Sequence, residues 1–271
     1  MKKLSLLFLI LIATTVFAQE EKESSGRKGT FYVYWGWNGS DFANADIQFK
    51  GNDYDFTLHN VVANDRQSKF EIRTYFNPLR MTIPQYNFRL GYYINNNWDV
   101  SIAVDHMKYV VANGQTVKID GYISGGTAYD GVYTNDDIVI SNDFLLFEHT
   151  DGLNYVNTEL RYNKTIFQQG KFDITAIAGA GFGILYPRTN TSLLNNARYD
   201  EFHLAGYGID ALVSGRLSYK NRFFMQPELK LGYINMPNIR TTMSSDDIAK
   251  QHFTYTQWNI VFGYLFELGK K

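Results

Sequence analysis

The chain has 271 residues, of which 26 are Lys or Arg and 27 are Asp or Glu, and it contains no cysteine. This balanced charge gives no indication of nucleic-acid binding, and without cysteine we expect neither disulfides nor a lipoprotein anchor. The 20 Tyr, 20 Phe and 4 Trp are a high aromatic content for a soluble domain, so the positions of these residues carry information.

The N-terminus has the pattern of a secretory signal peptide. Two lysines precede an apolar run over 4–12, and a small-residue cleavage motif ends at Ala18. The run is shorter than the roughly 20 residues that a helix needs to cross a bilayer. We therefore expect a signal peptide over 1–18, a flexible periplasmic segment over 19–28, and one folded domain over 29–271.

Eight later segments alternate apolar and polar side chains with a period of two, which is typical of strands whose faces meet different surroundings. In the first, Phe31, Val33 and Trp35 share an apolar face. The segments are 30–37, 85–94, 98–109, 155–162, 172–186, 205–219, 223–233 and 257–267. Pro227 predicts a bulge, a kink or an end of regular pairing in the seventh, because proline cannot donate to the ladder.

The connections between these segments alternate between short and long. The short ones are 95–97, 163–171 and 220–222, and the long ones are about 38–84, 110–154, 187–204 and 235–256. Short periplasmic turns and long extracellular loops are typical of outer-membrane barrels, so we expect both termini in the periplasm. Ten strands are the alternative, because 116–123 and 137–147 are also strand-like. We prefer an extracellular hairpin there, since 124–136 is too long for a periplasmic turn.

A soluble sandwich or a lipocalin-like barrel would show the same alternation. Aromatic residues at the segment ends, together with the signal peptide and the unequal loops, favour the membrane. These aromatic residues are Trp37, Trp98, Tyr162, Phe172, Tyr219 and Phe223. The prediction is an all-β, transmembrane, antiparallel up-and-down β-barrel of eight strands in the outer membrane of a Gram-negative cell.

The last segment carries a resemblance to a known family. The alternation of Trp258, Ile260, Phe262, Tyr264 and Phe266 resembles the C-terminal signature by which outer-membrane barrels are recognised for insertion, although five residues follow it here. The mature chain is similar to small OmpA/OmpX-like, porin-family-type barrels. The resemblance implies a monomer whose partners are outer-membrane lipids and the barrel-assembly machinery. It implies no single activity, because structural barrels, adhesins, channels and lipid A-modifying enzymes share this fold.

The alternation also predicts which charged side chains face the barrel interior. They are Arg89, Asp99, Asp105, Glu159, Arg161, Asp173, Asp210, Arg216, Glu228, Lys230 and Glu267. An interior of about eight strands is only just wide enough for side chains to fill it. We therefore expect a salt-bridged plug without a continuous pore, with a narrow channel for small solutes as the alternative.

Histidines near the predicted outer rim are the candidates for catalysis. Asp105 and His106 end the third segment, and His149 and Asp151 precede the fourth. A His oriented by a carboxylate would suit general-base chemistry on lipid A. No Ser partner or oxyanion donor is identifiable, however, so we favour a protein that is not an enzyme. No close ligand spacing indicates a metal, and we expect no cofactor.

The first long loop contains a mixture of aromatic and acidic residues. Phe49, Asp53, Tyr54, Asp55 and Phe56 have the composition of a surface that binds sugar or protein, and loops on a rigid scaffold often carry function. A solvated lid over the barrel mouth is the alternative. The predicted function is a structural or surface-recognition role, with an unidentified extracellular ligand, ahead of the channel and the lipid A-modifying enzyme.

Overall fold

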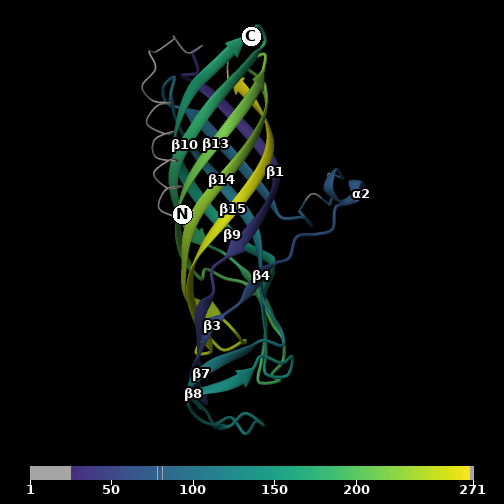
Figure 1. The fold of residues 1–271 in the computed structure, drawn as a ribbon, viewed down its shortest axis with the longest axis vertical. Helices are drawn as coiled ribbons and strands as arrows, with labels where there is room; N and C mark the ends of the chain where they lie inside the picture. Colours follow the sequence, from purple (N-terminus) through teal and green to yellow (C-terminus); the bar gives the residue numbers. More distant parts are fainter. Residues whose placement is uncertain (1–25, 78, 81, 269–271) are drawn as a thin grey trace, which may run out of the picture.

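The computed structural model describes residues 26–268 except 78 and 81, so the expected signal peptide over 1–18 lies outside the described residues. Long strands run side by side and wind around a common axis (Figure 1), and eight strands form the barrel wall. They are β1 (Thr30–Phe42), β5 (Tyr86–Tyr93), β6 (Trp98–Val111), β9 (Leu145–Gln169), β10 (Phe172–Leu185), β13 (Gly206–Tyr219), β14 (Phe223–Arg240) and β15 (Ile248–Glu267).

These strands close into a barrel. The order is β1-β5-β6-β9-β10-β13-β14-β15, every neighbouring pair is antiparallel, and β15 pairs with β1 from Thr30↔Glu267 to Phe42↔Tyr255. Closure leaves no barrel edge with unpaired backbone groups, which a bilayer could not satisfy. The prediction of eight strands is confirmed, and the ten-strand alternative is wrong.

Five strands, β1, β6, β9, β14 and β15, are longer than the sequence predicts, and β9 is longer at both of its ends. The expected connection over 163–171 shrinks to a tight turn at Gly170, which has the positive φ of 59° that such turns favour. Pro227 causes no register shift. It keeps its place opposite Ile260 of β15, but on the β13 side regular pairing is interrupted between Ser214↔Glu228 and Leu217↔Met225. The bulge in β14 lies instead between Met236 and Ile239.

The outer face of the barrel carries a continuous apolar belt. We call the end with the short turns the turn end and the opposite end the loop end. Aromatic rings pair around the turn end, as in Phe172–Tyr219 (5.0 Å between centroids) and Trp98–Tyr162 (5.1 Å). Such a belt, bordered by aromatic side chains, is that of a barrel that spans a membrane. No helix within the described residues is long and apolar enough to cross a membrane.

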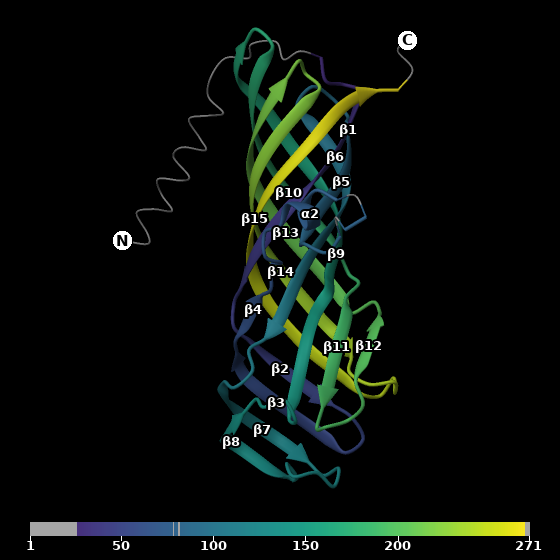
Figure 2. The same ribbon diagram turned by 90° about the vertical axis from the view of Figure 1, so that its right-hand side faces the viewer.

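Beyond the belt, the loop end carries a sheet that extends the barrel wall (Figure 2). We call the strands β2 (Ala45–Lys50), β3 (Tyr54–Val61), β7 (Thr116–Ile123) and β8 (Gly131–Val139) the distal sheet. It continues from β15 in the order β2-β3-β7-β8. The expected hairpin in the second long loop is present, with β7 at the predicted residues, but its second strand is β8 rather than 137–147, because residues 145–147 belong to β9.

Smaller elements complete the loop end. Strand β4 (Ala63–Asp65) pairs with β6, and the hairpin of β11 (Arg188–Leu193) and β12 (Tyr199–Phe202) pairs with β9. The short helix α2 (Ile72–Tyr75) stands out from the flank of the barrel (Figure 1).

The interior changes character along the barrel axis. Toward the turn end it is filled with charged and polar side chains, whereas toward the loop end it is a hydrophobic cluster that we call the loop-end core. Barrel strands contribute Met107, Tyr109, Ile234, Met236, Phe253 and Tyr255 to it, and the distal sheet contributes Ile47, Phe49, Phe56, Leu58 and Ile119. This core fixes the distal sheet to the barrel, because burying such side chains stabilises each by about 1.5–3 kcal/mol.

Candidate functional site

The polar half of the interior is organised around Glu159. Its carboxylate accepts hydrogen bonds from Arg89 Nη2 (2.6 Å), Arg161 Nε (2.6 Å) and Lys230 Nζ (2.8 Å). The side chains of all four residues are 0% exposed. One carboxylate therefore binds three cations that come from β5, β9 and β14, and it ties opposite walls of the barrel together.

Three further carboxylates lie close to these cations. Asp105 accepts from Lys230 Nζ at 2.5 Å, and Glu228 accepts from Arg161 Nη1 at 2.9 Å. Asp210 lies 3.8 Å from the same Lys230 Nζ. Buried charges require such pairing, since an isolated ion away from water is very costly.

Tyrosine hydroxyls connect the charges, and sequence reasoning did not assign them this role. Tyr34 Oη accepts hydrogen bonds from Arg89 Nε (2.8 Å) and Arg161 Nη2 (2.9 Å) and lies 3.2 Å from Glu228 Oε1. Tyr32 donates to Asp99 at 2.6 Å. The available signal was their alternation with the lipid-facing Phe31, Val33 and Trp35, which places both tyrosines in the interior.

Ten of the eleven charged residues that the sequence places inside are buried there: Arg89, Asp99, Asp105, Glu159, Arg161, Asp173, Asp210, Arg216, Glu228 and Lys230. Glu267 is the exception, because it ends β15 at the turn end and is exposed. The filled interior favours the plug over the narrow channel.

The turn end is closed by a residue that the sequence assigns to a flexible segment. Arg27 is buried, and its Nη2 donates to Thr175 Oγ1 (2.6 Å) and Thr165 Oγ1 (3.0 Å). It also contacts Asp173 Oδ1 at 3.4 Å. At least the last residues of 19–28 are therefore fixed to the barrel mouth, because a buried guanidinium requires these partners.

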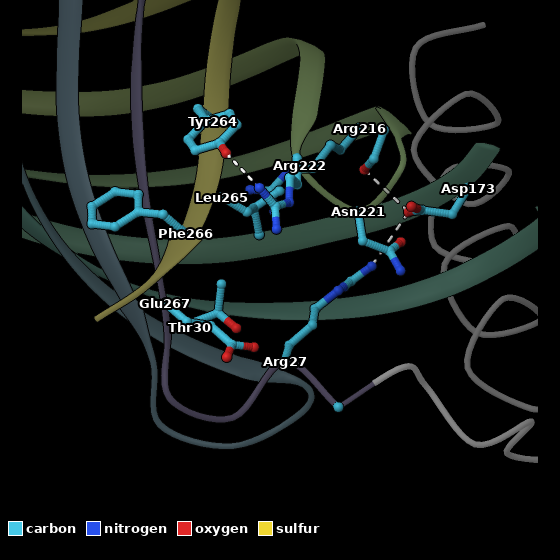
Figure 3. A pocket seen from close by; sticks show the side chains of 12 residues that line it. Arg27, Thr30, Asp173, Arg216, Asn221, Arg222, Tyr264, Leu265, Phe266 and Glu267 are labelled. Carbon is cyan, nitrogen blue, oxygen red and sulfur yellow. Dashed lines mark hydrogen bonds and ion pairs between the residues drawn. The ribbon is translucent and has the colours of Figure 1, made fainter. Parts of the chain in front are cut away.

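A cavity of about 500 Å³ opens at the same mouth (Figure 3). Arg27, Asp173 and Arg216 lie on its lining, and Arg222 donates to Tyr264 Oη at 3.1 Å across it. Arginines and carboxylates are mixed on this lining, and Arg27 pairs with Asp173 there.

The four candidate catalytic residues do not form a site. His106 contacts Asn154 Oδ1 (2.8 Å), buried His149 contacts Thr189 Oγ1 (3.1 Å), and Asp151 pairs with Arg188 (3.1 Å). No hydrogen bond joins them to one another within the described part of the chain. The physical reason is strand geometry. Successive side chains point to opposite faces, so Asp105 enters the interior network while His106 stacks on Tyr86 outside.

The aromatic residues proposed for binding in the first long loop are core residues. Phe49, Tyr54 and Phe56 are buried in the loop-end core. The interpretation of these rings as a binding surface is wrong, because the β2–β3 hairpin turns one face of its alternating pattern inward. Asp53 is exposed, and Asp55 pairs with Lys50 at 3.7 Å on the outer side.

The outer surface of the distal sheet is strongly acidic. Residues 45–61 and 116–139 contain seven Asp but only two basic residues, Lys50 and Lys118, which gives a net charge of −5 with His59 neutral. His59 lies between two of these carboxylates, 3.0 Å from Asp46 and 2.9 Å from Asp120. The hydrogen bond to Asp46 raises the pKa of His59 above its ordinary value.

One edge of the distal sheet is open. Strand β8 is the last described strand of the sheet, and most of its side chains are exposed, including Val132 at 83%. An open edge presents unpaired backbone groups to any strand-like partner. The acidic face and this edge together form a candidate interaction surface at the loop end.

The closed antiparallel barrel, its apolar belt and its charged interior define the class of membrane-spanning β-barrels. No protein-family model and no curated protein matches the chain. Solved structures with a similar architecture include Ail, the attachment invasion locus protein of Yersinia pestis (11% identity, 88% of this chain and 99% of that chain, TM-score 0.33). OprG from Pseudomonas aeruginosa (12%, 89% and 97%, 0.38) and Neisserial surface protein A (11%, 88% and 99%, 0.39) are also similar.

Proposed function

We propose that this protein is an outer-membrane barrel whose loop end faces the outside of the cell and whose distal sheet recognises a cationic partner. Short periplasmic turns and long external loops are the usual arrangement in such barrels, and they support this orientation. The net charge of −5 on the distal sheet supports a partner that carries clustered positive charge.

The observation that carries the proposal is the construction of the distal sheet. It is hydrogen-bonded to β15 through the pairing of Ile248–Gln251 with Ile47–Lys50. It also rests on the loop-end core, where Phe49 packs against Phe56 (5.4 Å) and Phe147 (5.6 Å). A lid that only covers the barrel mouth needs no such support, whereas a preorganised binding surface gains affinity from it.

Binding to defined polyelectrolytes tests the proposal. We expect the full-length barrel in phosphatidylcholine nanodiscs to bind immobilised polylysine and not to bind immobilised heparin. The double variant Asp136→Asn/Asp137→Asn on β8 should weaken polylysine binding several-fold, because it removes two exposed charges. The control Glu201→Gln, an exposed acid on β12, should change it little. Equal loss in both variants, or preference for heparin, would contradict the proposal.

The environment of His59 predicts a pH dependence of the distal sheet. The pKa of His59 is higher in the folded protein than in the unfolded chain, so protonated His59 stabilises the sheet. This stabilisation is complete below the unfolded pKa of about 6.5 and is lost as the pH rises through the folded pKa. Cleavage by a broad-specificity protease in the β2–β3 and β7–β8 hairpins should therefore increase between pH 6 and pH 8. The change should be larger than in His59→Gln, and identical pH profiles would show that the contact contributes nothing.

A further inference from the structure

A loop on the flank of the barrel exposes an unusual amount of apolar surface. We call the described residues between 66 and 85, which include α2, the flank loop. Its exposed apolar side chains include Phe70 (69%), Ile72 (70%), Phe76 (61%) and Leu79 (93%). Figure 1 shows that the loop stands away from the barrel wall, to one side of the axis, and in Figure 2 it lies in front of the barrel, away from the distal sheet. Exposed apolar patches of this kind mark a contact surface.

The flank loop is continuous with the lipid-facing belt. The Trp37 ring, on the outer face of β1, contacts the rings of Tyr75 (5.6 Å) and Phe76 (5.2 Å) on one side and Phe262 of β15 (6.2 Å) on the other. The apolar belt of the membrane-spanning strands therefore passes through Trp37 directly into the exposed side chains of the loop.

The orientation of the loop is fixed by hydrogen bonds to the barrel and within the loop. Lys108 Nζ of β6 donates to the Ile83 carbonyl at 2.8 Å, and Tyr75 Oη donates to the Ser68 carbonyl at 2.6 Å. Arg66 pairs with Glu148 of β9 at 2.8 Å. These contacts hold the loop against β6 and β9.

The charge of the flank loop is opposite to that of the distal sheet. Its sequence contains four basic residues and a single acid, Glu71. With Arg66 engaged by Glu148, the exposed cations are Lys69, Arg73 and Arg80. Apolar side chains combined with basic ones are typical of elements that lie in the membrane interface, where cations meet lipid phosphates.

We propose that the flank loop inserts its apolar side chains into the leaflet at the loop end and that Lys69, Arg73 and Arg80 bind the phosphate groups of anionic lipid there. The occupant is the lipid surface itself, because the loop continues the lipid-facing belt and carries the complementary charge. The proposal rests on the membrane-spanning belt and not on recognition by the distal sheet.

Fluorescent labels test the insertion, and the absence of native cysteine makes their attachment specific. The full chain with Leu79→Cys carries the environment-sensitive dye NBD, and Val132→Cys on β8 is the matched control because both native side chains are apolar and exposed. In phosphatidylcholine vesicles containing lipid A, we expect blue-shifted emission and strong quenching by bromine-labelled acyl chains at 79, with neither at 132. Equal solvation at both positions would overturn the proposal.

The role of the cations is tested by neutralising them. In the Leu79→Cys background, Lys69→Gln/Arg73→Gln/Arg80→Gln should abolish the increase in quenching that lipid A produces over phosphatidylcholine alone. Lys50→Gln/Lys118→Gln in the distal sheet should preserve it. If the flank-loop variant keeps the full lipid A effect, phosphate binding by these residues is wrong. Polylysine binding, measured on the same samples, reports on the distal sheet separately, so failure of the two proposals can be told apart.

Discussion

Replacing Glu159 with alanine should lower the free energy of unfolding of the barrel by about 3–5 kcal/mol, the usual cost of breaking a buried ion pair by removing one partner. The carboxylate of Glu159 accepts from Arg89, Arg161 and Lys230 in a region without solvent exposure. Among the described residues, Glu159 is the carboxylate that pairs with Arg89, so its loss leaves this buried guanidinium without an ion-pair partner. Arg161 keeps Glu228 and Lys230 keeps Asp105.

Urea unfolding of the protein in lipid vesicles, followed by tryptophan fluorescence, measures this effect. Glu201→Ala is the matched control, because Glu201 is exposed on β12, and substitutions at such positions usually stay within about 0.5 kcal/mol. Similar unfolding curves for the two variants would mean that water enters the interior and solvates the charges, which would contradict a sealed plug.

The substitution Gly36→Val should greatly reduce the yield of folded barrel. A Cβ atom at Gly36 would lie 2.1 Å from the carbonyl oxygen of Ile260 and 2.5 Å from Val261 Cα, both on the neighbouring strand β15. Because backbone cannot move aside without breaking the β1–β15 pairing that closes the barrel, we expect a cost at the upper end of the range for overpacking, about 3 kcal/mol.

Gly215→Val is the control for this steric argument. Gly215 faces outward on β13, and no described atom lies within 4 Å of a Cβ built there. Heat-modifiable electrophoretic mobility after refolding reports the folded fraction of each variant. Gly36→Val should lose most of the fast-migrating form and Gly215→Val should keep it. Equal folded fractions would show that the β1–β15 seam tolerates a side chain at this position.

The alternating pattern predicted the membrane-spanning parts of the strands because lipid and interior differ so strongly. It failed beyond the belt for a physical reason that β15 illustrates. From Trp258 onward, the outward side chains are apolar and the inward ones begin with polar residues such as Asn259. Over 248–256 the arrangement is reversed: Phe253 and Tyr255 point inward, whereas Lys250 and His252 point outward. The contrast between the two faces is inverted, so a pattern read for lipid-facing residues ends at this boundary.

The same boundary explains which site residues were predictable. The interior charges share a face with period two and were found. The hydrogen bonds that Tyr32 and Tyr34 make to them were not, because the pattern gives the face of a strand and not which side chains meet across the interior. The proposed convergence of Asp105 and His106 neglected that neighbours on one strand point to opposite faces. The aromatic residues of the first long loop form a core because the β2–β3 hairpin pairs with β15 on one side and with β7 on the other. Both pairings span long sequence separations, which no local pattern indicates.

The distal sheet can recognise an extracellular partner only if the loop end of the barrel faces the outside of the cell. Two single-cysteine variants test this, Asp137→Cys on the distal sheet and Lys171→Cys in the β9–β10 turn, both at exposed positions. With a membrane-impermeant maleimide, the cysteine at 137 should be labelled on intact cells and that at 171 only after the outer membrane is broken. If the cysteine at 171 but not the one at 137 is labelled on intact cells, the barrel has the opposite orientation. That result would contradict a recognition surface outside the cell.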